Sequence, residues 1–249
     1  MRTGIIILLG LLNAAVAAEQ RHYSIGVEPQ PYAPYYSTQA GEYRGYAREL
    51  LDAFAAAKGY RFDYRPMPVN RLFREFLGGR LDFKFPDNPQ WKAELKGGQR
   101  IHYSQSLTPY IDGTLVPRQH QGQGKARIKS LGALLGFTPS AYLDDISQGR
   151  IHLSQTSQID ALLKMALSER VDAVYLNVQV AEHHLRQLGT STPPLVFDPT
   201  LPYDRGDYYL SSLHHPQIIA ELNAFLREQA ALVKRLKRQY RVEWQPQGP

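Results

Sequence analysis

Hydrophobic and polar positions change their spacing within residues 70–91. The first apolar positions are Leu72, Phe73, Phe76 and Leu77. Their helical spacing predicts a short helix, and Gly78 and Gly79 predict its end because glycine readily adopts the left-handed conformation. Residues 81–85 then alternate as a strand does, and we expect Pro86 to close that strand. Residues 87–91 are polar or aromatic and follow the strand directly, where ligands bind in open α/β sheets.

The same pattern returns in the second half of the chain. Residues 159–167 again have helical spacing, and residues 170–175 (Arg-Val-Asp-Ala-Val-Tyr) align with residues 80–85. Five positions after each aspartate comes a polar residue, Asp87 in the first copy and Asn177 in the second. Two such units predict two lobes that present polar residues towards one cleft. A chance recurrence of a common helix–turn–strand unit is the alternative.

The rest of the chain alternates between predicted strands and helices, which is typical of parallel sheets covered by helices. The expected strands are 22–27, 60–64, 113–117, 151–153, 195–197 and 208–210, and the expected helices are 44–58, 178–188 and 217–240. The last helix has no sheet of its own to cover, so we expect it to return to the first lobe. The predicted fold class is therefore α/β, two-lobed, with two hinge crossings. We assign residues 19–116 plus 207–249 to lobe 1 and residues 117–206 to lobe 2.

The first residues predict a signal peptide. Arg2 precedes an apolar run at residues 5–12, and residues 15–17 (Ala-Val-Ala) have the form of a cleavage site. The run is shorter than the roughly 20 residues of a membrane-spanning helix. We therefore expect residues 1–18 to be cleaved and the mature protein to be periplasmic, in a Gram-negative bacterium. The chain contains no cysteine, so neither a disulfide nor a lipidated cysteine is possible.

Most of the surplus positive charge lies near the end of the last predicted helix. The basic residues there are Lys234, Arg235, Lys237, Arg238 and Arg241. Cations at a helix C-terminus complement the helix dipole and remain in water, and secretion argues against a nucleic-acid partner. We therefore predict no nucleic acid as a partner.

Two loops carry side chains suited to a small ligand. Residues 28–37 contain three prolines, which prevent a helix, and Tyr32 and Tyr35 offer flat faces with a hydroxyl at the tip. Packing between loop and lobe is the alternative for each tyrosine. In the second loop, Thr138 or Ser140 is expected to cap a helix whose free N–H groups could hold an anionic group, or to cap it without a ligand.

Several short motifs, in this order, carry a resemblance to a known family. They are Tyr32-Ala33-Pro34-Tyr35, Gly45-Tyr46, Gly79-Arg80-Leu81-Asp82, the segment from Tyr103-Ser104 to Pro109-Tyr110, and residues 170–174. Together they resemble the periplasmic solute-binding proteins of the amino-acid-binding type, called family 3, over nearly all of the mature chain. The resemblance implies two α/β lobes that are joined by two crossing strands and close over a ligand.

The residues that hold an amino acid in that family are replaced in this chain. The resemblance implies an arginine after the first-lobe strand to clamp an α-carboxylate, but that neighbourhood contains Trp91 and Lys92 and no arginine before Arg100. It also implies a carboxylate at the position of Asn177, which is uncharged. Asp87 and Asn88 stand where small hydroxyl residues are usual. Arg71 at the helix start could supply the missing cation, or it could be a surface residue.

These observations favour a binding protein that captures a small polar or aromatic solute between its lobes, for transport or sensing. The predicted ligand contacts are Tyr32, Tyr35, Arg71, Asp87, Asn88, Trp91, Ser140 and Asn177. We predict a monomer that has no catalytic activity, metal or cofactor. A membrane transporter or sensor is a possible partner. Adjacent histidines such as His183 and His184 point about 100° apart on a helix and so do not form a metal site. The alternatives are a dehydratase-like enzyme on the same fold and an interaction protein that has lost small-molecule binding.

Overall fold

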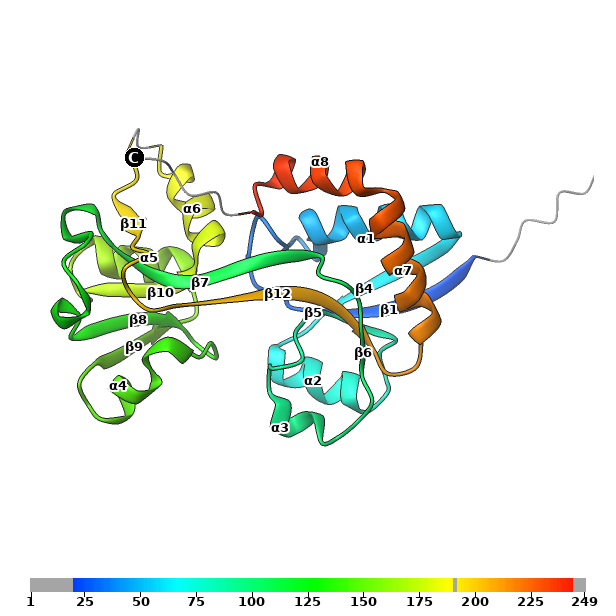
Figure 1. The fold of residues 1–249 in the computed structure, drawn as a ribbon, viewed down its shortest axis with the longest axis horizontal. Coiled ribbons are helices and arrows are strands. Elements are labelled where there is room, and N and C mark those ends of the chain that lie inside the picture. Colours follow the sequence, from blue (N-terminus) through cyan, green and yellow to red (C-terminus); the bar gives the residue numbers. More distant parts are fainter. Residues whose placement is uncertain (1–19, 190–191, 244–249) are drawn as a thin grey trace, which may run out of the picture.

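Two lobes are joined by two long antiparallel strands, β7 (Thr108–Pro117) and β12 (Tyr203–Ser212), which run side by side between them in Figure 1. The computed structural model describes residues 20–189 and 192–243. The predicted signal peptide, residues 1–18, lies outside these ranges. The two-lobed α/β fold class predicted from the sequence is confirmed.

Lobe 1 contains the β-α-β-α-β unit that the hydrophobic pattern predicts. Its first elements are β1 (Arg21–Val27), the hairpin of β2 (Ser37–Gln39) and β3 (Glu42–Arg44), α1 (Tyr46–Lys58), β4 (Tyr60–Pro66), α2 (Val69–Leu77), β5 (Phe83–Asp87), α3 (Ala93–Lys96) and β6 (His102–Tyr103). Strand β1 pairs in parallel with β4 on one side and with β5 on the other. Helix α1 buries Leu50, Leu51 and Phe54 against this sheet and ends at Gly59, whose φ of 69° is left-handed.

Lobe 2 repeats the arrangement with its own parallel strands. Its elements are β8 (Ser130–Leu134), α4 (Leu143–Ser147), β9 (His152–Thr156), α5 (Ile159–Leu167), β10 (Ala173–Asn177), α6 (Val178–Gln187) and β11 (Leu195–Phe197). Strand β8 lies between β9 and β10 and is parallel to both. The chain enters this lobe through short 3-10 turns at Arg118–His120 and Lys125–Arg127, within the polar segment expected at the boundary.

The crossing strands make one continuous sheet of the two lobes. Within the crossing, Asp112 lies opposite Asp204 and Tyr110 lies opposite Gly206. Strand β7 continues into lobe 2, where it pairs with β10, and β12 continues into lobe 1, where it pairs with β5. The boundaries assigned from the sequence, 116/117 and 206/207, fall inside these two strands.

The prediction that Pro86 closes its strand is wrong, because β5 continues through Asp87. Proline lacks the N–H group that a sheet normally uses, so it is tolerated where the pairing is irregular. The pairing of β5 with β12 is irregular at this point, with Tyr209 opposite Asp87 and Ser211 opposite Lys84.

The single long C-terminal helix predicted for residues 217–240 is also wrong in detail, because it is two helices. These are α7 (Pro216–Glu228) and α8 (Ala230–Tyr240), separated at Gln229 with φ −104° and ψ 31°. Helix α7 packs on β12 and β6, whereas α8 packs on α1, so the chain must turn to cover both surfaces. The predicted return to lobe 1 is confirmed, as Figure 1 shows.

The repeated aspartates of the sequence pattern occupy equivalent structural positions. Asp82 Oδ2 accepts hydrogen bonds from the backbone N and the hydroxyl of Ser24 at 2.7 and 2.8 Å. Asp172 Oδ2 accepts the same two bonds from Ser130, both at 2.8 Å. In each lobe the aspartate therefore links the start of one strand to the neighbouring strand. The repeated sequence pattern corresponds to the same hydrogen-bond arrangement in both lobes.

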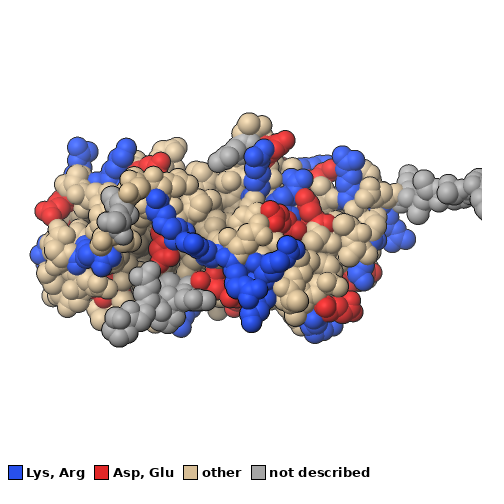
Figure 2. All heavy atoms as spheres, turned by 90° about the horizontal axis from the view of Figure 1, so that it is seen from above, with Lys and Arg blue, Asp and Glu red and all other residues tan. Residues whose placement is uncertain are grey.

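The basic residues near the end of α8 lie on the surface, as predicted. Lys234, Arg235, Arg238 and Arg241 are exposed, whereas Lys237 is half-buried and its Nζ lies 2.9 Å from Glu243 Oε1. Figure 2 shows lysines and arginines interspersed with acidic residues on the upper face of the molecule. Within the described residues, no helix combines the length and apolar character needed to span a bilayer.

Candidate ligand-binding site

A cavity of about 440 Å³ is lined by residues of both lobes and of both crossing strands. Lobe 1 contributes the end of β1, the loop after it, the start of α2 and residues 90–92. Lobe 2 contributes residues 136–138 and 140. The lining residues of the crossing strands are Tyr110, Asp112, Asp204, Arg205 and Tyr208. The volume lies within the range of about 300–1,000 Å³ that is usual for small-molecule sites.

One wall of the cavity is a stack of aromatic rings that joins the lobes. The ring of Tyr32 stacks on Tyr36 with centroids 5.4 Å apart and on Phe137 of lobe 2 with centroids 5.7 Å apart. Tyr32 is 2% exposed, so the proline-rich loop holds its ring firmly. This wall presents both an apolar surface and polarised ring edges.

A second set of rings is carried by the crossing strands and the loop after β5. Tyr110 stacks on Tyr208 with centroids 4.6 Å apart, and Trp91 meets Tyr208 edge to face at 5.8 Å. Gly206 makes the stack possible, because a Cβ at that position would lie 2.5 Å from the Tyr110 hydroxyl. The register of β7 and β12 therefore decides the shape of this side of the cavity.

Two carboxylates face the cavity from directly opposed positions, Asp112 on β7 and Asp204 on β12. Asp204 Oδ2 accepts a hydrogen bond of 2.6 Å from the hydroxyl of Tyr175. The pKa of Asp112 is raised to about 7, chiefly by burial and also by the neighbouring Asp204 charge, while a hydrogen bond from Asn177 opposes the shift. Like charges opposite each other in a sheet repel, so a compensating cation would be favourable here.

Glu28 supplies a third carboxylate, at the end of β1. It is 5% exposed and accepts a hydrogen bond of 2.8 Å from the hydroxyl of Tyr36. Burial raises the pKa of Glu28, while the positive charge of Lys84 and the bond from Tyr36 counteract this effect.

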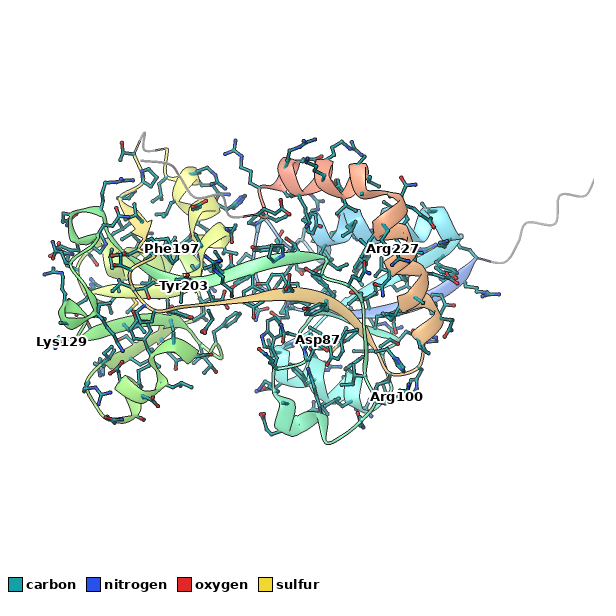
Figure 3. All side chains as sticks on the ribbon, viewed as in Figure 1. Asp87, Arg100, Lys129, Phe197, Tyr203 and Arg227 are labelled. Carbon is teal, nitrogen blue, oxygen red and sulfur yellow. The ribbon has the colours of Figure 1, made fainter. Side chains whose placement is uncertain are left out.

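The cations of the lining have partners of their own. Lys92 Nζ donates to Asn70 Oδ1 at 3.2 Å, and the exposed Arg205 lies 5.1 Å from the centre of the Tyr203 ring. Tyr203 packs on Phe197 in lobe 2, where Figure 3 labels both rings. Among the described residues, no group of three or more His, Cys, Asp or Glu side chains has a metal-binding arrangement.

Of the predicted contacts, Tyr32, Trp91 and Ser140 line this cavity. Ser140 begins the short 3-10 turn Ser140–Tyr142, and the prediction that Thr138 or Ser140 caps a helix there is wrong. The turn follows Pro139, no side chain caps it or α4, and the Ser140 hydroxyl instead faces the Thr138 carbonyl at 3.4 Å. Ser140 itself is exposed and belongs to lobe 2.

Tyr35 and Asn177 lie behind the main lining. The hydroxyl of Tyr35 donates to Gln179 Oε1 of lobe 2 at 3.0 Å, and its ring meets Tyr208 edge to face. Asn177 caps α6 by accepting from Val180 N at 3.1 Å, and its Nδ2 donates to the Tyr208 hydroxyl at 3.4 Å. Asn177 also lines a small hollow of about 20 Å³, whose lining shares Tyr32 and Asp112 with the main cavity.

Asp87 and Asn88 are buried and lie outside the cavity lining. Asp87 Oδ1 lies 3.2 Å from Lys84 Nζ and 3.3 Å from Lys96 Nζ, in the position that Figure 3 labels beside β12. Asn88 donates to the Asp207 carbonyl and accepts from Gln90 N. These two side chains therefore shape the turn that presents Trp91.

Arg71 does not line the cavity either. Its side chain is 61% exposed, and its Nε lies 4.0 Å from Glu75 on the same helix. Arg71 is therefore a surface residue, which was the alternative considered from the sequence.

Sequence reasoning missed the residues of the crossing strands, namely Tyr110, Asp112, Asp204 and Tyr208. The available signal was alternation, because Tyr110 and Asp112 share one face of β7, and Asp204 and Tyr208 share one face of β12. Only the register of the two strands shows that these faces are the same side of the sheet.

No protein-family model matches the chain, and neither does any curated protein sequence. Solved structures do match it. The GluR0 ligand-binding core in complex with L-glutamate has a TM-score of 0.69 at 14% identity, covering 89% of this chain and 99% of the other. An arginine transport system periplasmic binding protein from Legionella pneumophila has a TM-score of 0.65 at 14% identity, covering 88% and 99%.

A further structural neighbour is an ancestral amino acid-binding protein described as a precursor of cyclohexadienyl dehydratase. Its TM-score is 0.66 at 13% identity, covering 88% of this chain and 94% of the other. At such identities the likeness is one of fold. The chain therefore has the two-lobed fold of the family 3 periplasmic amino-acid-binding proteins, which is the fold that the sequence predicts.

Proposed function

We propose that this protein is a periplasmic solute-binding protein that captures a small solute between its lobes, for transport or sensing. The observation that carries the proposal is the cavity, whose lining combines aromatic rings from both lobes and both crossing strands with carboxylates from lobe 1 and both crossing strands. A ligand that contacts both lobes binds more strongly when they close, so it shifts the protein towards the closed form.

The hinge of this movement lies in β7 and β12 in our proposal, with lobe 1 as residues 19–116 plus 207–249 and lobe 2 as residues 117–206. The signal peptide predicted at residues 1–18 and the periplasmic location of a structural neighbour support export to the periplasm. The partners are a small molecule and, for the loaded form, a membrane transporter or sensor. We propose a monomer.

The predicted contact residues divide into roles in this proposal. Tyr32 and Trp91 form walls of the site, and Ser140 offers a polar contact at its opening. Tyr35 and Asn177 orient the ring of Tyr208 from behind. Asp87 and Asn88 hold the loop that carries Trp91, and Arg71 has no direct contact with the ligand in the present conformation.

Thermal-shift screening of the mature protein against amino acids, amines, aromatic acids and short peptides tests the proposal. A specific ligand raises the melting temperature, because it binds only the folded protein. Small-angle X-ray scattering should then give a smaller radius of gyration with the stabilising compound than without it. A panel without any stabilising compound, or a ligand that leaves the radius unchanged, would argue against capture by closure and for the interaction protein.

An enzyme on this fold is a second candidate, and Asp112 favours it. A cleft carboxyl with a pKa raised by burial to about 7 is suited to proton transfer. One structural neighbour is also described as a dehydratase precursor. We nevertheless propose binding without turnover. Incubation of the stabilising compound with the protein, followed by mass spectrometry, separates the two, because an enzyme converts the compound and a binding protein returns it unchanged.

A further inference from the structure

The cavity lining contains more carboxylates than cations, and the cations contact other groups. Three carboxylates line it, Glu28, Asp112 and Asp204, against the cations Lys92 and Arg205. Lys92 is bonded to Asn70, and Arg205 is exposed over the ring of Tyr203. The cations thus have partners away from the carboxylates.

Asp112 has an incomplete set of hydrogen bonds. Its Oδ1 atom is buried and has no hydrogen-bond partner among the described residues. A buried acceptor without a donor is costly to the fold, so it marks a place where a ligand group can supply the donor. Asp204, directly opposite, already accepts from Tyr175, so its negative charge adds to the attraction for a cation.

The aromatic rings strengthen this preference. Ring faces attract ammonium and guanidinium groups, most strongly where water is excluded. The rings that line the cavity are Tyr32, Tyr36, Phe73, Trp91, Tyr110, Phe137 and Tyr208. Phe73 and Trp91 already contact Lys84, whose Nζ lies 4.2 and 5.8 Å from their ring centres, so the rings nearest the carboxylates, Tyr110 and Tyr208, remain for a ligand cation.

An anionic ligand group would find in the cavity lining only Lys92, which donates to Asn70, and the exposed Arg205. The buried ammonium groups of Lys84 and Lys96 both contact Asp87, and neither lines the cavity. An α-carboxylate placed near Asp112 and Asp204 would be repelled by both.

We propose that this cavity takes a small organic cation that lacks a carboxylate, a protonated amine or guanidinium compound, with Asp112 as its counter-ion and the rings of Trp91, Tyr110 and Tyr208 around it. This inference rests on the proposed function, and it names the ligand class of the same site. With three carboxylates against two cations, the lining favours a cation over a zwitterion.

Matched pairs of compounds that differ only by a carboxylate test the inference by isothermal titration calorimetry. The pairs are agmatine and arginine, putrescine and ornithine, and tyramine and tyrosine. We expect at least one amine to bind ten times or more tightly than its parent amino acid. Equal or tighter binding of the amino acids overturns the inference while leaving solute capture intact. If no amine binds, the inference also fails, and the broader screen described above judges capture separately.

The variant Asp112→Asn tests the counter-ion. It should weaken amine binding at least tenfold, whereas Asp207→Asn should change it less than twofold. Asp207 is the matched control because it lies on the other crossing strand, β12, on the face opposite to that of Asp204 and outside this cavity lining. Unchanged amine affinity in Asp112→Asn, in a variant that still melts cooperatively, overturns the role of Asp112.

The pH dependence supplies an independent readout. The groups that face Asp112 are Asn177 from β10, Asp204 from β12, and five tyrosines whose pKa values are all raised by burial, Tyr32, Tyr35, Tyr110, Tyr175 and Tyr208. Since these tyrosines stay neutral, we expect amine affinity to fall several-fold between pH 8 and pH 6, as Asp112 takes up a proton. The decline should be absent in Asp112→Asn. The same decline in the variant would overturn the assignment.

Discussion

Asp112 is a carboxyl group that the fold keeps at a cost in stability. Its pKa is raised by burial to about 7, whereas an aspartate in an unfolded chain ionises near pH 4. Between these values the folded protein holds a proton that the unfolded chain has released. The stability contributed by this group is therefore highest below about pH 4, falls as pH rises, and is lowest above about pH 7.

Replacement of Asp112 by Asn should stabilise the protein at pH 8, because the amide carries no charge to bury. We expect a rise in melting temperature of at least about 2–4 °C, which corresponds to about 1 kcal/mol for a chain of this size. Little change is expected at pH 4, where Asp112 is neutral in the folded protein. Differential scanning calorimetry at both pH values measures the effect, and a lower melting temperature at pH 8 would contradict it.

Replacement of Asp87, in contrast, should destabilise the protein. It is fully buried and contacts the ammonium groups of Lys84 and Lys96, so Asp87→Ala leaves two buried cations without their counter-ion. Removing one partner of a buried ion pair costs about 3–5 kcal/mol. Urea unfolding followed by circular dichroism measures this loss.

The control for that experiment is Asp63→Ala, because Asp63 is exposed and its nearest cation, Arg61, is 3.9 Å away. A change within about 0.5 kcal/mol is expected there. Equal unfolding free energies of the two variants would show that Asp87 does not stabilise the fold.

Individual ligand contacts were predicted from the chemical type of a residue and from its position in a loop. Tyr32 and Trp91 were found because aromatic residues in polar loops are unusual, and both line the cavity. Asp112 was not found, because its neighbours Ile111 and Gly113 are those of an ordinary strand. Asp87 has a polar side chain at a strand end, as ligand contacts do, but the lysines that surround it come from separate positions in the sequence.

In the crossing strands, position 206 requires a glycine because a side chain there would collide with Tyr110. A Cβ at this position would lie 2.5 Å from the Tyr110 hydroxyl oxygen and 2.6 Å from its ring, so the small residue on β12 and the large one on β7 are a matched pair. Their register keeps the rings of Tyr110 and Tyr208 stacked.

Gly206→Ala should therefore cost about 1–3 kcal/mol of unfolding free energy, as overpacking of a fitted site usually does. In a Tyr110→Ala background the same change should cost less than about 0.5 kcal/mol, since the space is then free. Chemical denaturation of the wild type, the two single variants and the double variant gives the coupling energy. An equal cost in both backgrounds would mean that Tyr110 is not the group that Gly206 accommodates.

The elements themselves were predictable where the apolar spacing was regular, as in α1, α2 and α5. The errors came from tertiary contacts. Gln229 interrupts an otherwise continuous helical pattern because α7 and α8 cover different surfaces. Pro86 remains within β5 because the partner strand is irregular at that point. Neither cause is visible in the residues that surround the error.

For the molecule as a whole, Tyr35 links the lobes. Its hydroxyl donates to Gln179 Oε1 on α6 of lobe 2 and also lies 3.3 Å from the carbonyl of Val242, near the end of α8. Three segments far apart in the sequence therefore meet at one side chain of the proline-rich loop.

Tyr35→Phe should loosen this junction in both lobes, with a loss of about 1–2 kcal/mol because buried acceptors lose their donor. Hydrogen–deuterium exchange should become faster in residues 31–36 of lobe 1 and at the start of α6 in lobe 2. Tyr23→Phe, in the same lobe and part of a ring cluster with Tyr60 and Phe83, is the control. Faster exchange confined to lobe 1 would show that the lobes are not coupled through this hydroxyl.

Two lobes were predictable because the sequence repeats a helix, an aspartate and a strand, and the hydrogen bonds of Asp82 and Asp172 show the physical reason for the repeat. The cavity chemistry was not, because it depends on how β7 and β12 align over their shared length. That alignment involves residues about 90 positions apart, and the hydrophobic pattern of either strand fits several registers.

The crossing strands also set an order for folding during synthesis. Between β7 and β12 the chain of lobe 2 is continuous, so all its parallel strands and helices leave the ribosome before β12 does. Lobe 1 needs β12, α7 and α8 to cover its sheet and α1. Lobe 2 can therefore close its core while lobe 1 still waits for its last segment, and the apolar faces that wait longest, and most need protection from aggregation, are those of β5 and α1.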